Sequence, residues 1–94
     1  MKEHDVDAVI ENTARHFGMP KKLLCDHSNR TPRVAYARHL AMFLARQMTH
    51  GSYITVGKGF GFTHTSVMYA CRQIGKGSHK KDIDAITELV KGGK

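Results

Sequence analysis

One segment limits the folds open to this chain more than any other. It is a run of glycines and aromatic residues, Gly57–Phe62, that leads directly into a helix-like pattern. Thr63 is a favoured helix N-cap, and polar side chains fill the first turn after it, namely His64, Thr65 and Ser66. Apolar residues then recur at helical spacing and should face a core: Val67, Cys71 and Ile74. The segment predicts a helix with an anchored body and a polar N-terminal tip that is free to meet a ligand.

A shorter helix is expected just before this one. Ser52 is suited to cap it, and the helix would run to about Lys58. Ile54 and Thr55 are β-branched, so propensity alone leaves a strand as the alternative. Gly61 would close the unit. Two short helices joined by a glycine-containing turn form the helix-turn-helix pattern, in which the start of the second helix reaches base edges in a major groove.

Four further helices follow from apolar periodicity, and no linker or repeat divides the chain. The longest, from about Val34 to His50, is apolar over more than half of its circumference and should be the central core helix. Pro32 biases the residue before it towards extended geometry, so residues 26–32 should form a non-helical loop. The other helices are expected at about residues 5–17, 21–25 and 82–90. The sequence predicts one all-α domain of five to six helices over residues 1–94, with 1–4 and 92–94 frayed.

The charge balance points to a polyanionic partner. Fifteen Lys and Arg residues against eight Asp and Glu residues give a net charge of +7 and a pI near 9.7. A small basic domain is typical of nucleic-acid binders, and a charge that serves only solubility is the alternative. Arg30 stands on the extended loop beside Pro32, from which it could reach a minor groove. The basic residues around the central helix and the turn would contact phosphate: Arg33, Arg38, Arg46 and Lys58.

The sequence offers little material for catalysis or for metal binding. No two of the seven histidines are three or four residues apart, and none pairs locally with a cysteine, so zinc-finger spacing is absent. The acidic residues cluster near the two ends, which leaves few general acids or bases in the middle. We therefore expect no enzymatic activity, no metal and no cofactor.

Cysteine usage and hydropathy suggest a compartment. Cys25 and Cys71 form no CxxC pair and are expected to be small core residues in a reducing cytosol. The charged N-terminus lacks the apolar region of a secretory signal, and no apolar run approaches membrane-spanning length. The expectation is a cytoplasmic, nucleoid-associated protein with no membrane contact.

Two other functions fit parts of the sequence. Lys58–Phe62 matches the first five positions of an RNA-recognition signature, which belongs on a central strand whose aromatic residues stack on bases. A Val and an aromatic residue should follow there, whereas this chain continues with Thr63, and helix-period segments flank the motif. Alternatively, an exposed face around Tyr53, Phe62 and Tyr69 would dock a protein partner, and any DNA affinity would reflect charge alone.

Three stretches carry a resemblance that covers residues 7–90. They are the loop and long helix from Arg30 to Thr49, the turn Val56–Gly61, and the segment His64–Ile74. The last of these closely follows a His-Thr-Thr-Val…Ala…Lys-Ile signature. In these stretches the chain resembles domain IV, the C-terminal DNA-binding domain, of the bacterial replication initiator DnaA.

The resemblance implies a Trp-repressor-like fold that binds double-stranded DNA, as a monomer more than as a dimer, in replication-related or transcriptional regulation. Protein partners stay open. By matching positions, it implies base readout by the start of the recognition helix and by the arm, that is, by Thr63, His64, Thr65, Ser66 and Arg30. It implies phosphate contact by the start of the preceding helix, at Ser52, Tyr53 and Ile54, and near Arg38 and Arg46.

The chain departs from the family at several points. The family usually has a basic residue and then an Asp before the His-Thr pair, where this chain has Phe62 and Thr63 in a turn one residue shorter. Because a carboxylate accepts a hydrogen bond from cytosine and a Thr alone does not, the preferred site is expected to differ from the standard one. Tyr53-Ile54 replaces the usual Leu-Pro. The 94 residues cannot hold the initiator's ATPase domain, and the start at Met1 favours a standalone regulator or competitor over an excised domain.

Overall fold

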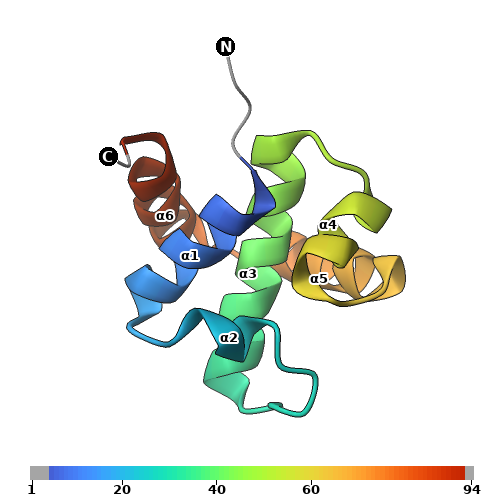
Figure 1. Cartoon of the computed structure of the whole chain (residues 1–94). Helices are drawn as coiled ribbons and strands as arrows, with labels where there is room; N and C mark the ends of the chain where they lie inside the picture. Colours follow the sequence, from blue (N-terminus) through green and yellow to red (C-terminus); the bar gives the residue numbers. More distant parts are fainter. Residues whose placement is uncertain (1–4, 93–94) are drawn as a thin grey trace.

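The computed structural model describes residues 5–92, and these form six α-helices and no strand (Figure 1). The predicted all-α class with a helix-turn-helix is confirmed. The residues expected to fray, 1–4 and 92–94, lie outside the described part except for Gly92, which is helical. The helices are α1 (Val6–Phe17), α2 (Lys21–Leu24), α3 (Pro32–Thr49), α4 (Tyr53–Phe60), α5 (His64–Lys76) and α6 (Lys80–Gly92).

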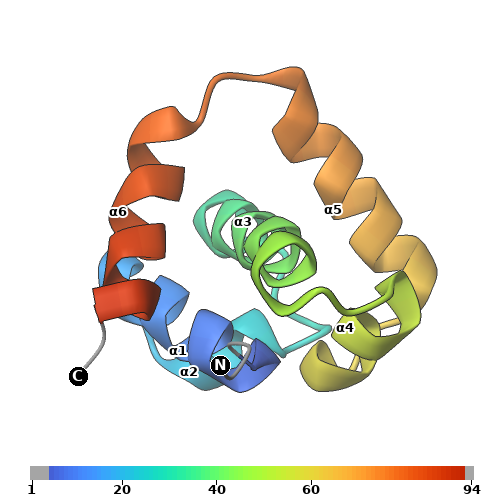
Figure 2. The same ribbon diagram turned by 90° about the horizontal axis from the view of Figure 1, so that it is seen from above.

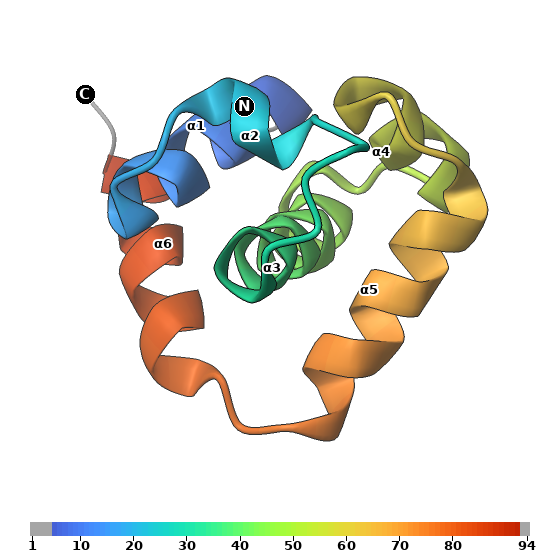
Figure 3. The same ribbon diagram turned by 90° about the horizontal axis from the view of Figure 1, so that it is seen from below.

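Helix α3 is the axis of the molecule, and the other five helices surround it (Figures 2 and 3). Helix α5 packs along one side of α3 and α1 along another, while α6 lies against α1. The residues of α3 that face these neighbours alternate between leucine and alanine, and the small alanine side chains let the flanking helices approach closely. They are fully buried: Ala37, Leu40, Ala41, Leu44 and Ala45.

The helix starts follow from local chemistry. Three N-caps lie where the sequence suggests: Asp5, Ser52 and Thr63 accept hydrogen bonds from the backbone N–H groups three residues later. Helix α3 begins two residues earlier than predicted, at Pro32, because a proline at the first helical position loses no hydrogen bond there. Helix α6 also begins earlier than predicted, at Lys80.

The turn between α4 and α5 is built by glycines. Gly61 has φ 77° and ends α4 in the left-handed conformation, which glycine adopts at no steric cost. The N–H of Phe62 donates to the Gly57 carbonyl at 2.8 Å, so the chain folds back onto α4. A Cβ atom on Gly57 would lie 2.7 Å from the Phe62 carbonyl oxygen. Lys58–Phe62 is therefore a helix end and a turn, and the strand required by the RNA-recognition alternative is not formed.

Arg38, which the sequence predicts to contact phosphate, is largely buried in the structure. The residue is only 7% exposed. Its Nε donates to the Leu24 carbonyl at 2.9 Å, and its Nη2 donates to the carbonyls of Leu23, Asp26 and Asn29. A guanidinium suits this role because it presents several donors in a fixed plane. Arg38 therefore holds the end of α2 and the loop before Arg30 against α3.

A second polar cluster joins α1, α3 and α6. The Tyr36 hydroxyl donates to Asp82 Oδ2 at 2.7 Å, and His16 Nε2 donates to Asp82 Oδ1 at 2.9 Å. These two hydrogen bonds hold the pKa of the Asp82 carboxyl below its usual range. Burial, with the bond to Asp82, raises the pKa of Tyr36 to about 12. The charged carboxylate thus links three helices at neutral pH.

The Gly57 contact predicts opposite effects of the same substitution at two helical glycines. Gly57→Ala should lower the free energy of unfolding by about 1–3 kcal/mol, because the added methyl group meets backbone atoms. Gly75→Ala, in α5, meets nothing within 4 Å and should raise it by roughly 0.5–1 kcal/mol through helix propensity. Urea denaturation measures both variants, and equal effects would contradict the role assigned to Gly57.

The Arg38 contacts predict a large loss of stability. Arg38→Ala should lower the free energy of unfolding by about 3 kcal/mol or more, because it removes several charge-assisted hydrogen bonds at once. Arg46→Ala on the same helix is the matched control. Arg46 has one hydrogen bond, to the Gly51 carbonyl, so the loss should be about 1 kcal/mol. Denaturation curves that rank the two variants equally would contradict this account.

Candidate nucleic-acid interface

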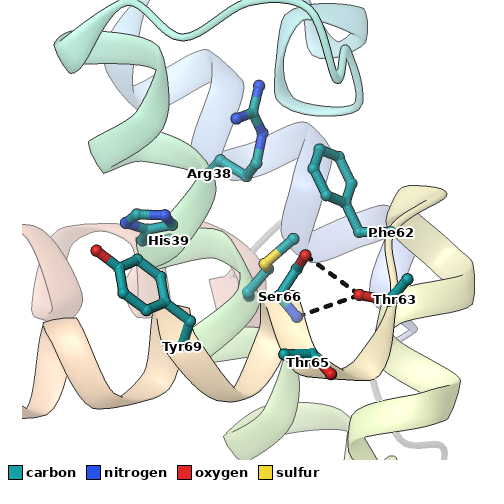
Figure 4. A pocket seen from close by; sticks show the side chains of 8 residues that line it. Arg38, His39, Phe62, Thr63, Thr65, Ser66 and Tyr69 are labelled. Carbon is teal, nitrogen blue, oxygen red and sulfur yellow. Dashed lines mark hydrogen bonds between the residues drawn. The ribbon is translucent and has the colours of Figure 1, made fainter.

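The N-terminal tip of α5 is polar and open. Thr63, His64 and Thr65 are exposed and Ser66 is half-buried. The Thr63 hydroxyl accepts from the Ser66 N–H at 3.4 Å and lies 3.3 Å from the Ser66 hydroxyl (Figure 4). His64 and Thr65 have no side-chain hydrogen bond within residues 5–92. Their donors and acceptors are therefore available to a ligand, while Thr63 and Ser66 partly satisfy one another.

A hollow of about 330 Å³ lies beside this tip, between α3 and α5. Figure 4 shows Phe62 and Arg38 on one side of it and His39 and Tyr69 on another. Polar groups from both helices therefore border one open space. The hollow is lined by Arg38, His39, Met42, Phe62, Thr63, Thr65, Ser66 and Tyr69.

One histidine in the hollow is held neutral. The His39 and Tyr69 rings meet edge to face, with centroids 5.5 Å apart. Burial lowers the pKa of His39, and the charge of Arg38 lowers it further. An imidazole normally titrates near pH 6.5, so His39 is uncharged at neutral pH. It offers this surface a hydrogen-bonding group without adding charge.

The other cations predicted to contact DNA differ in how they are engaged. Arg30 and Lys58 are exposed and have no ion-pair or hydrogen-bond partner in the described part of the chain. Arg33 is exposed but donates to the carbonyl of Phe17, the last residue of α1. Arg46 is half-buried, and its guanidinium carbon lies 4.2 Å from the centroid of the Tyr53 ring. Of these four cations, only Arg30 and Lys58 have no donor engaged within residues 5–92.

The start of α4 combines a cap with an exposed apolar side chain. Ser52 is exposed and accepts from the Thr55 N–H at 3.1 Å, and Ile54 is 57% exposed. Tyr53 is half-buried beneath Arg46. The face proposed for a protein partner is thus less exposed than expected. Phe62 is also half-buried, and only Tyr69 of that face is exposed.

The outward side of α5 carries residues that the sequence argument left out of the DNA interface. Met68 is 40% exposed and Tyr69 is 51% exposed, and Arg72 is also exposed. They follow Thr65 at steps of three and four residues, so they continue the face that its tip begins. The periodicity used to find the core could have identified them, because they occupy the complementary positions.

Charge is segregated on the molecule. The sequence has no Asp or Glu between Asp26 and Asp82, so α3, α4 and α5 contain none. The described acidic residues other than Asp26 belong to α1, its cap or α6, which lie side by side (Figure 1). The helix-turn-helix therefore faces solvent without a carboxylate of its own.

Other kinds of site find little support in residues 5–92. No three His, Cys, Asp or Glu side chains among them gather closely enough to hold a metal ion. Cys25 and Cys71 are free and half-buried, and burial raises the pKa of both thiols. None of the described helices combines the length and the apolar character needed to cross a bilayer.

Comparison with known proteins places the chain. A family described as the bacterial dnaA protein helix-turn-helix matches residues 6–74. The chain is 34% identical over 84 residues to the chromosomal replication initiator protein DnaA of Tropheryma whipplei (strain Twist), covering 87% of this chain and 17% of that protein. It is 34% identical over 98 residues to the protein of that name from Caulobacter vibrioides, covering 97% of this chain and 20% of that protein. The chain thus spans about a fifth or less of these relatives' length, and it belongs to the family of bacterial DnaA C-terminal helix-turn-helix domains.

Proposed function

We propose that this protein binds double-stranded DNA in a sequence-specific manner, with α5 in the major groove and Arg30 in the adjacent minor groove. The observation that carries the proposal is the open polar tip of α5, in a helix-turn-helix that contains no acidic residue. His64 and Thr65 project from the first turn of α5 with unpaired polar atoms. Short polar side chains at the start of a recognition helix are suited to hydrogen bonds with base edges.

The hollow beside α5 fits the DNA strand that must separate these two contacts. A sugar-phosphate backbone runs between any major groove and the neighbouring minor groove, so it has to pass between the tip of α5 and Arg30. The hollow offers this strand a hydroxyl from Tyr69, the neutral imidazole of His39 and the rim of the Arg38 guanidinium. Neutral donors and a partly screened cation can both bind phosphate oxygens. In this proposal the main role of Arg38 is to position the loop that carries Arg30, and only the exposed edge of its guanidinium contacts the DNA backbone.

Phosphate contacts at the edges of the interface fall to the uncommitted groups. Lys58 near the end of α4 is the clearest candidate, and Arg33 and Arg46 would contribute with the donors that their carbonyl partners leave free. At the start of α4, Ser52 and Tyr53 offer hydroxyl groups near the backbone. Ile54 is exposed there and is suited to van der Waals contact with sugar or thymine methyl groups.

Base choice at the N-cap should depend on Thr63. Its hydroxyl is engaged with the N–H and the hydroxyl of Ser66, and it has no negative charge. A carboxylate at this position would accept strongly from a cytosine amino group, whereas a hydroxyl is compatible with several bases. We therefore propose that the DNA sequence preferred by this protein differs from the sequence that a domain with an acidic N-cap would prefer.

The biological setting is proposed from the relatives. Because they are named chromosomal replication initiator proteins, we propose a replication-related or transcriptional role in which binding, without catalysis, is the activity. We further propose that one copy occupies one site. The duplexes that the protein selects from a random pool would define that site.

Base readout predicts a loss confined to the selected duplex. His64→Ala or Thr65→Ala should weaken binding to that duplex by roughly 1–3 kcal/mol per lost base contact, with little change on random duplex. Ser78→Ala, an exposed polar position outside the helix-turn-helix, serves as the control. Fluorescence anisotropy titrations measure all three. Equal loss on selected and random DNA would contradict base readout by these side chains.

Phosphate contact predicts a change in salt dependence. Lys58→Ala should weaken all duplexes alike and reduce the slope of log affinity against log salt by about 0.9 per lost contact. Lys91→Ala removes the same charge from an exposed position on α6 and should leave the slope unchanged. Titrations at four salt concentrations separate the two. Identical slopes for both variants would show that Lys58 contributes only to net charge.

A further inference from the structure

The loop that carries Arg30 touches the helix-turn-helix through an aromatic stack. The His27 and Phe62 rings are nearly parallel, with an interplanar angle of 5° and centroids 4.0 Å apart. His27 Nε2 also donates to the carbonyl of Gly61. One side chain from the loop between α2 and α3 is thus attached, by its face and by its edge, to the turn between α4 and α5.

Phe62 receives a second contact from the residue that orders the same loop. The guanidinium carbon of Arg38 lies 5.0 Å from the Phe62 ring centroid, within cation–π range. The same guanidinium holds the loop in place, because it donates to the carbonyls of Asp26 and Asn29. Phe62 is therefore in contact both with the loop, through His27, and with the side chain that ties the loop to α3.

The loop is also braced internally on both sides of its exposed arginine. Asn29, which precedes Arg30, bonds through its carbonyl to Arg38 and through its Oδ1 to the N–H of Thr31. Asp26 Oδ1 accepts from the N–H and the hydroxyl of Ser28. The backbone around Arg30 therefore has a defined shape. The His27–Phe62 contact joins this loop directly to the turn that leads into α5.

From this geometry we infer that His27 and Phe62 are positioning residues for DNA reading. They fix Arg30 relative to α5, so that the minor-groove arm and the major-groove helix engage one site in a single register. The inference rests on the proposed DNA-binding function and adds to it a coupling between its two parts. Ordering a loop before binding removes an entropic cost from association, so loosening the loop should weaken specific binding.

The test uses the duplex that the wild-type protein selects from a random pool, with each adenine replaced in turn by 2,6-diaminopurine. The added amino group fills the minor groove and leaves the major-groove edge of the base unchanged. Arg30→Ala reports the complete loss of the arm. His27→Ala removes the stack, and His27→Phe keeps a ring for stacking. Thr31→Ala is a control in the same loop, because the Thr31 side chain is exposed and makes no cap hydrogen bond.

The wild-type protein should lose affinity when diaminopurine stands at the base pairs under the arm, and Arg30→Ala should not sense it. His27→Ala should bind the unmodified duplex roughly tenfold more weakly, with a reduced response to diaminopurine and unchanged binding to random duplex. His27→Phe should restore much of the affinity for the unmodified duplex and much of the response to diaminopurine. The double variant His27→Ala/Arg30→Ala should bind no more weakly than Arg30→Ala alone. Thermal denaturation of each variant confirms that the fold is retained.

Each contrary result has a distinct meaning. If His27→Ala binds normally, or loses affinity additively with Arg30→Ala while keeping the full diaminopurine response, the positioning role is overturned and the DNA-binding proposal stands. If the wild-type protein selects no duplex, the proposed sequence-specific binding is overturned and the positioning role with it. If it selects a duplex but shows no diaminopurine response anywhere in that site, the minor-groove arm is overturned, and the positioning role with it. A loss of affinity for His27→Phe as large as that for His27→Ala would assign the effect to the Gly61 hydrogen bond and overturn the role of the stack.

Discussion

The close approach of Gly57 to the Phe62 carbonyl is the contact on which the helix-turn-helix depends. With no Cβ at residue 57, the chain folds back directly onto α4, and the Phe62 N–H closes that helix. The next residue, Thr63, is then in place to cap α5. The angle between the two helices and the start of the second are thus set by one missing side chain. The polar tip of α5, the hollow and the stack on Phe62 all take their positions from this turn.

Structural features that depend only on neighbouring residues could be predicted from the sequence. The caps at Ser52 and Thr63 and the periodicity of the core need only contacts within one or two helical turns. The role of Arg38 could not be inferred from its charge, because its acceptors are carbonyls 9 to 15 residues earlier in the chain. One signal was present, since Ala41, Met42 and Ala45 share its helical face and are buried. A cation on that face has to find internal partners.

The candidate site likewise has parts that depend on neighbouring residues and parts that depend on distant ones. The placement of Thr63 to Ser66 at the exposed start of α5 follows from local pattern, and the structure agrees with it. The contact between His27 and Phe62 joins residues 35 apart in sequence, and no periodicity relates them. Basic composition alone also overstated the number of free cations, because some guanidinium groups bond to backbone carbonyls at helix ends and loops. Charge counted from sequence describes the field around the protein better than it describes the contacts that a given arginine can make.

The separation of acidic helices from the helix-turn-helix gives the molecule a permanent electric dipole. Its less positive end lies over α1 and α6, where acidic residues offset the basic ones, and its more positive end lies towards the surface that includes α4 and α5. Near a polyanion such a body experiences a torque before any atoms touch, and the torque is felt within about one Debye length. Random tumbling would then be biased towards encounters in which α5 leads, so a larger fraction of collisions would begin in a productive orientation.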